Sequence, residues 1–419
     1  VLIRSTTRVS HSMSVVGTAE RKAVERKAYV KDSLRWVMTP VNARKRHAVV
    51  EERLVNLQDD SAEMAVEYIN STTGIITSGA VYQYVREALP EASVLKLGMV
   101  WPLPLEKIKA FAQKVDKLYV VEELDRFIEN ELKAQGIAIE SLERSVCGEL
   151  SVDAVKALFG AEHTVDEIAE LPIRLPNMCA GCSHRGIYYA ISRLKLSVTG
   201  DIGCYTLGYM PPLAAMDSCI CMGASVSMAH GFDKGSKGEL ARKAVGIIGD
   251  STFMHTGING LMNSVYNNGT STVVILDNRI TGMTGHQPNP GSGFTIKGDP
   301  ANQIDLEQLC RAVGVKHVNR ADPFDIDKCT ELLKQETARE EVSVIIAERP
   351  CIFVDKSGKK APYEVNVECS GCKMCLRLGC PAISWDSERK KAVIDESMCI
   401  GCGLCPKVCR FDAIEQVVL

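Results

Sequence analysis

The sequence predicts an α/β fold built on parallel sheets, followed by a small α+β domain at the C-terminal end. In two separate stretches, 74–122 and 245–287, short apolar segments alternate with segments of helical spacing. This alternation is typical of parallel sheets with crossover helices. Eight of the 17 cysteines lie between Cys369 and Cys409, so we expect the last domain to be organised by metal or cluster ligands.

Composition places the chain among globular proteins. Its 419 residues are 46% hydrophobic and 24% charged, and at roughly 150 residues per domain this length predicts about three domains. The net charge of −3 gives no reason to expect a nucleic acid as partner. The longest apolar runs are far short of the ~20 residues that cross a membrane. No signal peptide is visible, so the cysteines favour metal–sulfur chemistry over disulfides.

The first 60 residues predict no complete domain. Residues 1–12 have the pattern of one strand and its following loop, and residues 21–53 are basic and polar. Because lysine and arginine are interleaved with valine, alanine and glutamate, we favour a solvated connector over an anion-binding or nucleic-acid-binding patch. The chain starts at Val1 without a methionine, so we expect an N-terminally shortened fragment.

A small parallel-sheet domain is predicted next. Its expected strands and helices alternate along the chain; they are 74–79, 93–98 and 117–122 for the strands and 81–89 and 105–114 for the helices. The glycine turn after the first strand is not a GxGxxG fingerprint, so we expect a scaffolding and interface domain without a nucleotide. The polar, helical stretch 151–175 is predicted to be a linker.

The stretch 245–287 predicts a strand–helix–strand unit. Two apolar segments, Val245–Ile248 and Thr272–Leu276, flank a segment that can hold one helix starting near Phe253. A right-handed crossover makes the two strands parallel, so their carboxyl ends meet at one edge of the sheet. In α/β sheets this edge is where ligands bind.

Polar residues follow both of these strands. Asp250 follows the first and Asn278 the second, with 27 residues between them. Carboxylate and amide oxygens suit Mg²⁺ and leave positions for phosphate oxygens. Gly249 lets the backbone approach a phosphate, and the helix N-terminus adds partial positive charge. An ordinary βαβ unit with polar turn residues is the alternative, because short motifs have real false-positive rates.

Cysteine spacing at the C-terminus predicts two [4Fe–4S] clusters. The first run is Cys-x2-Cys-x2-Cys-x4-Cys-Pro, and the second is Cys-x2-Cys-x2-Cys-x3-Cys. In two-cluster ferredoxins the fourth cysteine of each run binds the other cluster. The expected ligand sets are Cys369, Cys372, Cys375 and Cys409 for the first cluster, and Cys399, Cys402, Cys405 and Cys380 for the second. Zinc is the alternative, although zinc sites usually pair CxxC units.

These runs depart from the usual ferredoxin pattern in two ways. Four residues, rather than three, precede Cys380, and Arg410 stands where proline is usual. A positive charge beside a cluster favours its reduced form. We therefore hypothesise that Arg410 raises the reduction potential of a cluster.

Further motifs occur in the sequence order CxGCxHR, GDIGCYTLG, CMGAS, GDSTF, LDNRITGMTGHQP and RPC. They are preceded by RSTTRVSHS, VMTPVNARKRH, GMVWPLP and YVVEELD. Together they cover nearly the whole chain and resemble the alpha subunits of indolepyruvate ferredoxin oxidoreductases, which are thiamine-diphosphate-dependent 2-oxoacid:ferredoxin oxidoreductases. The GDS…N arrangement resembles the diphosphate-binding motif of thiamine diphosphate enzymes, with Ser251 where many members have glycine.

The resemblance implies five segments. These are a remnant of a pyrimidine-binding domain with its connector (1–60), a middle α/β domain of the transketolase C-terminal type (61–150), a linker (151–175), a diphosphate-binding domain (176–360) and a ferredoxin-type domain (361–419). The glutamate that activates the cofactor would lie in the missing part of the pyrimidine-binding domain. No residue of this chain is therefore assigned to that catalytic role.

The resemblance also assigns a cofactor site. Mg²⁺ would be held by Asp250, Asn278 and the Ile280 carbonyl. The residues expected to contact thiamine diphosphate are Gly203, Cys204, Tyr205, Gly249, Asp250, Ser251, Asn278, Ile280, Gly282 and Met283. His184 and His286 could approach the substrate, but hydrogen-bonded loop histidines are the more frequent case.

A third cluster is implied near the cofactor. Its ligands would be Cys179, Cys182, Cys204 and Cys351, from the CxxC turn, the Gly-Cys turn and the late Pro-Cys. The alternative is four buried, reduced cysteines, since cysteine often serves as a small hydrophobe. The other cysteines are expected in the core or in loops; they are Cys147, Cys219, Cys221, Cys310 and Cys329.

The implied reaction is the oxidative decarboxylation of an arylpyruvate such as indolepyruvate. The cofactor would serve as electron sink, coenzyme A would take the acyl group, and electrons would leave through the clusters to ferredoxin. A beta subunit partner, a hetero-oligomer and an anaerobic, cytoplasmic setting are implied as well. Two alternatives stay open: a non-oxidative thiamine diphosphate decarboxylase or carboligase, and an electron-transfer subunit with a vestigial cofactor site.

Overall fold

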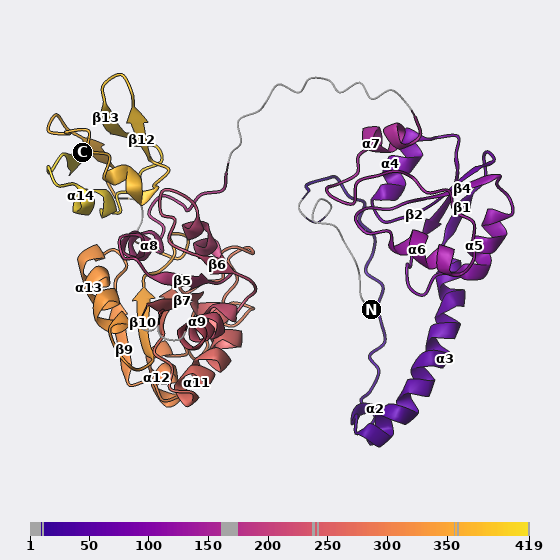
Figure 1. Ribbon diagram of the computed structural model, residues 1–419, viewed down its shortest axis with the longest axis horizontal. Helices are drawn as coiled ribbons and strands as arrows, with labels where there is room; N and C mark the ends of the chain where they lie inside the picture. Colours follow the sequence, from indigo (N-terminus) through magenta and orange to yellow (C-terminus); the bar gives the residue numbers. More distant parts are fainter. Residues whose placement is uncertain are drawn as a thin grey trace. The chain divides into compact units, whose positions relative to one another are not determined.

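The computed structural model describes most of the chain (Figure 1). The described residues are 10, 12–160, 175–236, 239–240, 243–355, 357 and 360–417. The chain forms two compact units, Val1–Leu171 and Pro172–Leu419. Most of the strand expected at 1–12, and most of the second half of the expected linker, lie outside the described residues.

The connector expected in the first 60 residues contains two helices. A short helix, α2 (Ser33–Trp36), precedes the long α3 (Pro40–Met64). Thr39 caps α3 by accepting a hydrogen bond from the Asn42 N–H, and proline occupies the first helical position, where its missing N–H costs nothing. Only Ser61 of α3 is buried, as is typical of a solvated segment.

A four-stranded sheet organises the rest of the first unit, in the order β1-β3-β2-β4. Its central strands are parallel, and β1 pairs antiparallel with β3. The expected strands and helices are all present; only the edge strand β1 and helix α6 were not predicted. The elements are β1 (Val66–Tyr68), β2 (Thr73–Ser78), α4 (Val81–Ala88), β3 (Ser93–Leu97), α5 (Leu105–Ala112), β4 (Lys117–Val121) and α6 (Phe127–Ala134).

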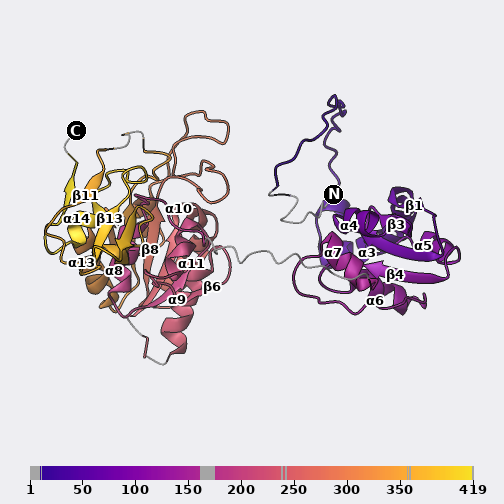
Figure 2. The ribbon, with the colours of Figure 1, turned by 90° about the horizontal axis from the view of Figure 1, so that it is seen from above.

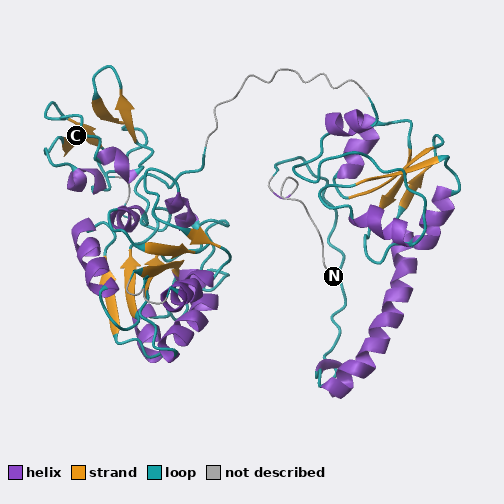
Figure 3. Cartoon of the chain, viewed as in Figure 1, coloured by secondary structure: helices purple, strands orange, loops and turns teal. Residues whose placement is uncertain are grey.

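Helices cover both faces of this sheet (Figure 3). Successive strand side chains point to opposite faces, so Ile75 and Ile76 enter two different cores. The segment expected to open the linker forms α7 (Val152–Leu158), in which Val155 is buried in the same core as Ile75. The start of the predicted linker therefore belongs to the first unit, because Val155 packs into the core of that unit.

A six-stranded parallel sheet organises the second unit, in the order β6-β5-β7-β8-β10-β9. Its middle strands β7 and β8 are buried along their whole length, as expected for a sheet with helices on both faces. Figure 2 shows these helices around the sheet. The strands are β5 (Ser197–Gly200), β6 (Ser218–Cys219), β7 (Ala244–Gly249), β8 (Thr272–Asp277), β9 (His317–Ala321) and β10 (Ser343–Glu348).

The helix after β7 starts earlier than predicted. It begins directly at Asp250 rather than near Phe253, with Gly249 as its N-cap residue, and a π-helical turn (η2, Phe253–Gly257) interrupts it. Single π-helical turns are frequent at functional sites. The helices of this part are α8 (Arg185–Ser192), η1 (Cys204–Tyr209), α9 (Ala224–Gly235), α10 (Asp250–Thr252), α11 (Ile258–Tyr266), α12 (Leu306–Ala312) and α13 (Ile326–Thr337).

The cysteine-rich C-terminal part consists of two short antiparallel strand pairs and two helical turns. These are β11 (Tyr363–Val365), η3 (Cys375–Leu378), β12 (Ile383–Asp386), β13 (Lys391–Ile394), α14 (Leu404–Val408) and β14 (Ile414–Gln416). One hydrophobic core joins this part to the sheet: it contains Val245 of β7, Ile187 of α8, and Leu378 and Leu404 of the cysteine-rich part. The two are therefore packed as one unit.

Helix α8 lies between the sheet and the cysteine-rich part (Figure 1). A side chain at Gly186 would overlap the Pro323 carbonyl and approach Leu404. Lys407 of α14 donates a hydrogen bond to the Phe324 carbonyl (3.0 Å). The loop before α13 is thus held between α8 and α14. Among the described helices, none is long and apolar enough to cross a membrane.

We expect Gly186→Ala to destabilise the second unit by about 1–3 kcal/mol, because the added methyl group has no space beside the Pro323 carbonyl. Gly231→Ala is the matched control, since α9 leaves the space around Gly231 empty. Alanine should there be neutral or stabilise the helix by about 0.5–1 kcal/mol. Denaturant unfolding of both variants measures the difference. Equal stabilities would contradict the packing of α8.

Candidate functional site

Asp250 lies at the carboxyl end of β7, where the chain turns into a helix. Its side chain is 2% exposed, and the Asn289 Nδ2 group donates a hydrogen bond to Asp250 Oδ2 (2.9 Å). Burial and, to a smaller extent, the nearby carboxylate of Asp277 raise the pKa of Asp250 to about 7, although hydrogen bonds oppose both effects. A buried carboxylate beside a second one is a favourable place for a cation.

Asn278 follows the neighbouring strand β8. The register pairs Gly249 with Leu276, so Asp250 and Asn278 leave the sheet at the same edge. The Asn278 side chain is buried; its Oδ1 accepts the Ile280 N–H (3.2 Å), and its Nδ2 lies 3.4 Å from His184 Nε2. The expected arrangement of a carboxylate and an amide at one edge is therefore present.

The Tyr205 ring fills the space beside Gly249. A side-chain carbon at Gly249 would lie 2.8 Å from the ring, and one at Gly203 would also overlap it. The Tyr205 hydroxyl donates to the Ile202 carbonyl (3.2 Å). In this structure the absence of a side chain at Gly249 makes room for the Tyr205 ring.

His184 contacts this ring edge-on, with ring centroids 5.7 Å apart. It is buried, and burial lowers its pKa to about 4. His184 is therefore a neutral, buried histidine that contacts Asn278. His286, in contrast, is exposed, and its ring stacks edge-on against Phe353.

The other residues expected at the cofactor lie on two neighbouring loops. Ser251 and Ile280 are half-buried, and Met283 is 51% exposed. A side chain at Gly282 would come within 3.4 Å of Cys204 Sγ. The loop after β8 therefore lies against the Gly-Cys turn.

Two buried residues of this site were not predicted from the sequence. Asn289 joins Asp250 to the next loop, and its Oδ1 accepts the Gly291 N–H (2.8 Å). Asp201 is fully buried and accepts the N–H groups of Gly223 (2.8 Å) and Ser225 (3.3 Å), at the start of α9. The Pro-Asn-Pro sequence around Asn289 is the only signal that could have drawn attention to it, because the contact spans 39 residues.

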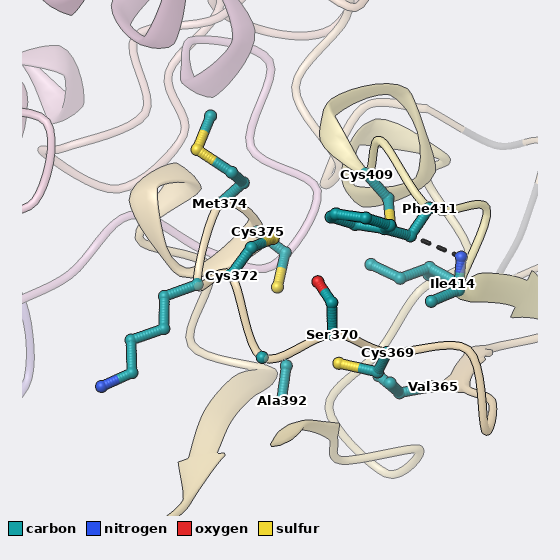
Figure 4. A pocket seen from close by; sticks show the side chains of 13 residues that line it. Val365, Cys369, Ser370, Cys372, Met374, Cys375, Ala392, Cys409, Phe411 and Ile414 are labelled. Atoms are coloured by element: carbon teal, nitrogen blue, oxygen red, sulfur yellow. Dashed lines mark hydrogen bonds between the residues drawn. The ribbon is translucent and has the colours of Figure 1, made fainter. Parts of the chain in front are cut away.

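The first expected cluster set surrounds one hollow in the C-terminal part (Figure 4). Cys409, from the second run, faces Cys369 and Cys375, from the first. Cys372 and Lys373 also line the hollow, with apolar residues such as Phe411. The crosswise grouping expected from ferredoxins is thus the grouping that the fold produces.

The second expected set surrounds another hollow. Its cysteine members are Cys380, Cys399, Cys402 and Cys405. The remaining lining is apolar except for Tyr363 and Arg185, and it includes Ala180 and Gly181 of the CxxC turn. Each hollow therefore combines three cysteines of one run with one of the other.

Burial disfavours the thiolate form of three cysteines that line the hollows. Burial raises the pKa of Cys375 to about 11, and it raises the pKa of Cys402 and of Cys405, with the neighbouring cysteines adding to the effect. Metal sites bind thiolates, so loading them releases protons. Arg410 is exposed and lines neither hollow, so its charge is solvated.

The four cysteines proposed for a third cluster gather at one place. Cys179 lies close enough to Cys182, Cys204 and Cys351 to raise the pKa of each of these thiols, and Cys204 lies similarly close to Cys182 and Cys351. Burial raises the pKa of Cys182 to about 12. The Cys351 N–H donates to the Asn278 carbonyl (3.0 Å). This third group therefore adjoins the Asp250–Asn278 edge.

The remaining cysteines divide into two kinds. Cys310 and Cys329 are fully buried in α12 and α13, whereas Cys147, Cys219 and Cys221 are exposed. Within the described ranges, no three histidine, cysteine or acidic side chains stand close enough to hold a single metal ion. The cysteines instead lie around hollows. This spacing is expected of ligands that bind different iron atoms of one cluster rather than one metal ion.

Comparison with protein families matches three parts of the chain. The thiamine pyrophosphate enzyme C-terminal TPP-binding domain matches residues 201–347, the indolepyruvate oxidoreductase domain residues 74–193, and the 4Fe-4S binding domain residues 392–415. The predicted fold class is confirmed by these matches together with the parallel sheet. They also identify the chain as an oxidoreductase component with thiamine pyrophosphate and iron–sulfur features.

Curated relatives match over the whole chain. Indolepyruvate oxidoreductase subunit IorA of Pyrococcus abyssi is 36% identical and covers 100% of this chain and 73% of its own length. The subunit IorA of Archaeoglobus fulgidus is 35% identical and covers 99% and 72%. A solved 2-oxoglutarate:ferredoxin oxidoreductase from Magnetococcus marinus covers 47% of this chain and 73% of its own, with 22% identity and a TM-score of 0.38. From the sequence matches, the chain belongs to the family of indolepyruvate ferredoxin oxidoreductase alpha subunits, within the thiamine-diphosphate-dependent 2-oxoacid:ferredoxin oxidoreductases.

Proposed function

We propose that the chain, in complex with a beta subunit, oxidatively decarboxylates arylpyruvates such as indolepyruvate to aryl-acyl-CoA and CO₂, and passes the electrons to ferredoxin. One observation carries this proposal. The Asp250–Asn278 edge adjoins one group of four cysteines, and that group adjoins the hollow lined by Cys380, Cys399, Cys402 and Cys405 within a single packed unit. The edge where the 2-oxo acid would react and the cysteine groups that would carry single electrons thus lie next to each other.

The cofactor edge fits Mg²⁺ and a diphosphate. Asp250 and Asn278 would hold the metal through their side chains and Ile280 through its carbonyl. The metal would relieve the repulsion between Asp250 and Asp277, which contributes to the raised pKa of Asp250. When bound, thiamine diphosphate supplies the nucleophilic carbon and the electron sink for decarboxylation.

The surrounding residues orient this edge and keep water out. Asn289 donates a hydrogen bond to Asp250 Oδ2 and so fixes the orientation of this carboxylate. Tyr205 and the neutral His184 fill the space behind Asn278 and Gly249 without adding charge. The glutamate that activates the cofactor is assigned to no residue of this chain.

The cysteine groups would supply the electron exit. Three four-iron clusters would be held by the sets that line the two hollows and by the third group, Cys179, Cys182, Cys204 and Cys351. Clusters held there would supply one-electron acceptors, through which two electrons per turnover would leave one at a time. Both hollows have apolar side chains in their linings, such as Ile414 in the first and Leu378 in the second.

A spectrophotometric assay tests the proposed reaction. The anaerobic complex with its beta subunit should reduce ferredoxin when given indolepyruvate, coenzyme A and thiamine diphosphate with Mg²⁺, and it should reduce far less with pyruvate. Release of an aldehyde without ferredoxin reduction would instead establish a non-oxidative decarboxylase.

Asp250→Asn should lower the affinity for Mg²⁺ and thiamine diphosphate by at least about tenfold, because the metal loses a charged ligand. Asp327→Asn is the control, since Asp327 is exposed on α13. Calorimetric titration measures both affinities. Unchanged binding by Asp250→Asn would contradict the assignment.

Asp250 should also make metal-free stability depend on pH. Its folded pKa of about 7 lies above the ordinary value of about 3.9. The folded state therefore binds the proton more tightly, and Asp250 destabilises the fold as pH rises through that window. Without Mg²⁺, Asp250→Asn should raise the unfolding midpoint relative to the parent at pH 8 but not at pH 4. The same difference at both values would show that Asp250 does not titrate in this range.

Cys351→Ala should remove about four irons per chain if the third group holds a cluster. Cys329→Ala is the matched control, because Cys329 is buried but belongs to no group. Iron and acid-labile sulfide are measured after anaerobic purification, together with the electron paramagnetic resonance spectrum of the reduced protein. Full iron content in Cys351→Ala would count against the third cluster.

A further inference from the structure

Arg185 is a cation buried in the centre of the second unit. It opens α8, directly after the CxxC turn, and its side chain is 1% exposed. Its guanidinium donates hydrogen bonds to three backbone carbonyls: Leu378 (2.7 Å), Met178 (2.6 Å) and Cys179 (3.1 Å). These bonds orient the group but bring no opposite charge.

Among the described residues, no carboxylate forms an ion pair with Arg185. In the part of the chain that the structure describes, every partner of the Arg185 guanidinium is a neutral carbonyl, and Nε has no partner at all. An uncompensated buried charge is destabilising even after the protein relaxes. Proteins that keep such a cation normally place an anion beside it.

Two cysteine groups flank this cation. Arg185 lines the hollow formed by Cys380, Cys399, Cys402 and Cys405, and it is the one charged side chain among the described residues that line it. Its charge favours the thiolate forms of both Cys402 and Cys182, against the larger effect of burial. Arg185 thus stands between the hollow and the third group.

The two groups also touch. A side chain at Gly181, between Cys179 and Cys182, would overlap Ile400 and come within 3.4 Å of the Cys402 Cβ atom. The CxxC turn is therefore pressed against the second cysteine run. The hollow of the first run, with Cys369 and Cys409, is lined by different residues and does not include Arg185.

We infer that Arg185 is the counter-charge of the cluster held by Cys380, Cys399, Cys402 and Cys405, and that it raises the reduction potential of this cluster. The inference rests on the proposed function for the presence of the cluster. A four-thiolate cluster is anionic and gains one further negative charge when an electron from the 2-oxo acid reduces it, while no bond forms or breaks. The buried cation stabilises the reduced form more than the oxidised form.

Arg185 differs from two other cations near the cysteines, Arg410 and Lys373, because they are exposed to solvent and it is buried. Arg410 adjoins Cys409 in sequence but is exposed. Lys373 lines the first hollow, yet it too is exposed and lies over the Trp385 ring (4.2 Å). Water and salt screen such charges, so their effect on a cluster should be smaller than that of a guanidinium with 1% exposure.

The test is a redox titration followed by electron paramagnetic resonance, on the anaerobic complex with its beta subunit. Three variants are compared with the parent: Arg185→Gln removes the buried charge, Arg185→Lys keeps it without the forked hydrogen bonds, and Arg410→Gln removes an exposed charge. Iron and acid-labile sulfide are measured on every sample, so that a lost cluster is distinguished from a shifted potential.

We expect Arg185→Gln to lower the potential of one cluster, Arg185→Lys to keep it closer to the parent value, and Arg410→Gln to leave it unchanged. If Arg185→Gln loses that cluster's iron while Arg185→Lys retains it, the counter-charge is likewise supported. Full iron content with an unchanged reduction potential in Arg185→Gln would overturn this inference but leave the proposed function standing. Equal iron loss from both variants would assign Arg185 a purely structural role. A parent complex without iron would overturn the proposed function as well.

Discussion

The contact between the CxxC turn and the second cysteine run determines what the second unit can do. Gly181 and Gly186 lack side chains where Ile400, the Pro323 carbonyl and Leu404 come closest, so α8 packs tightly between the sheet and the cysteine-rich part. Because one core continues across this contact, the cysteine groups are fixed relative to the Asp250–Asn278 edge. A flexible tether would leave these distances variable, and electron transfer depends steeply on distance.

Two charged side chains of this unit, Asp250 and Arg185, are buried, and burial of each charge is electrostatically unfavourable. At the sheet edge it raises the pKa of Asp250 to about 7, in a position where Asp277 adds repulsion. At the start of α8 it isolates the charge of Arg185. A cation beside Asp250 and an anion beside Arg185 would each offset this cost. The proposed Mg²⁺ ion and the proposed iron–sulfur cluster would satisfy these opposite requirements.

Local patterns made much of the fold predictable. The strands around Ile76 and Ile247 were foreseen because apolar runs bounded by turn residues need only neighbouring residues to specify them. The crosswise cysteine sets were foreseen because their spacing has few geometric solutions. Asn289, Asp201 and Arg185 were not foreseen as site residues, since each acts through contacts with segments far away in sequence. The helix α7 was predicted as part of a linker. Only one of its residues, Val155, is buried, so its sequence shows little hydrophobic periodicity.

The central claim is that three groups of four cysteines in one unit each hold a four-iron cluster. The most direct test is the content of iron and acid-labile sulfide per chain after anaerobic purification. The account predicts about twelve of each. About eight of each would leave Cys179, Cys182, Cys204 and Cys351 as free thiols and contradict the link between the cofactor edge and the two hollows. Zinc without sulfide would contradict the electron-transfer role altogether.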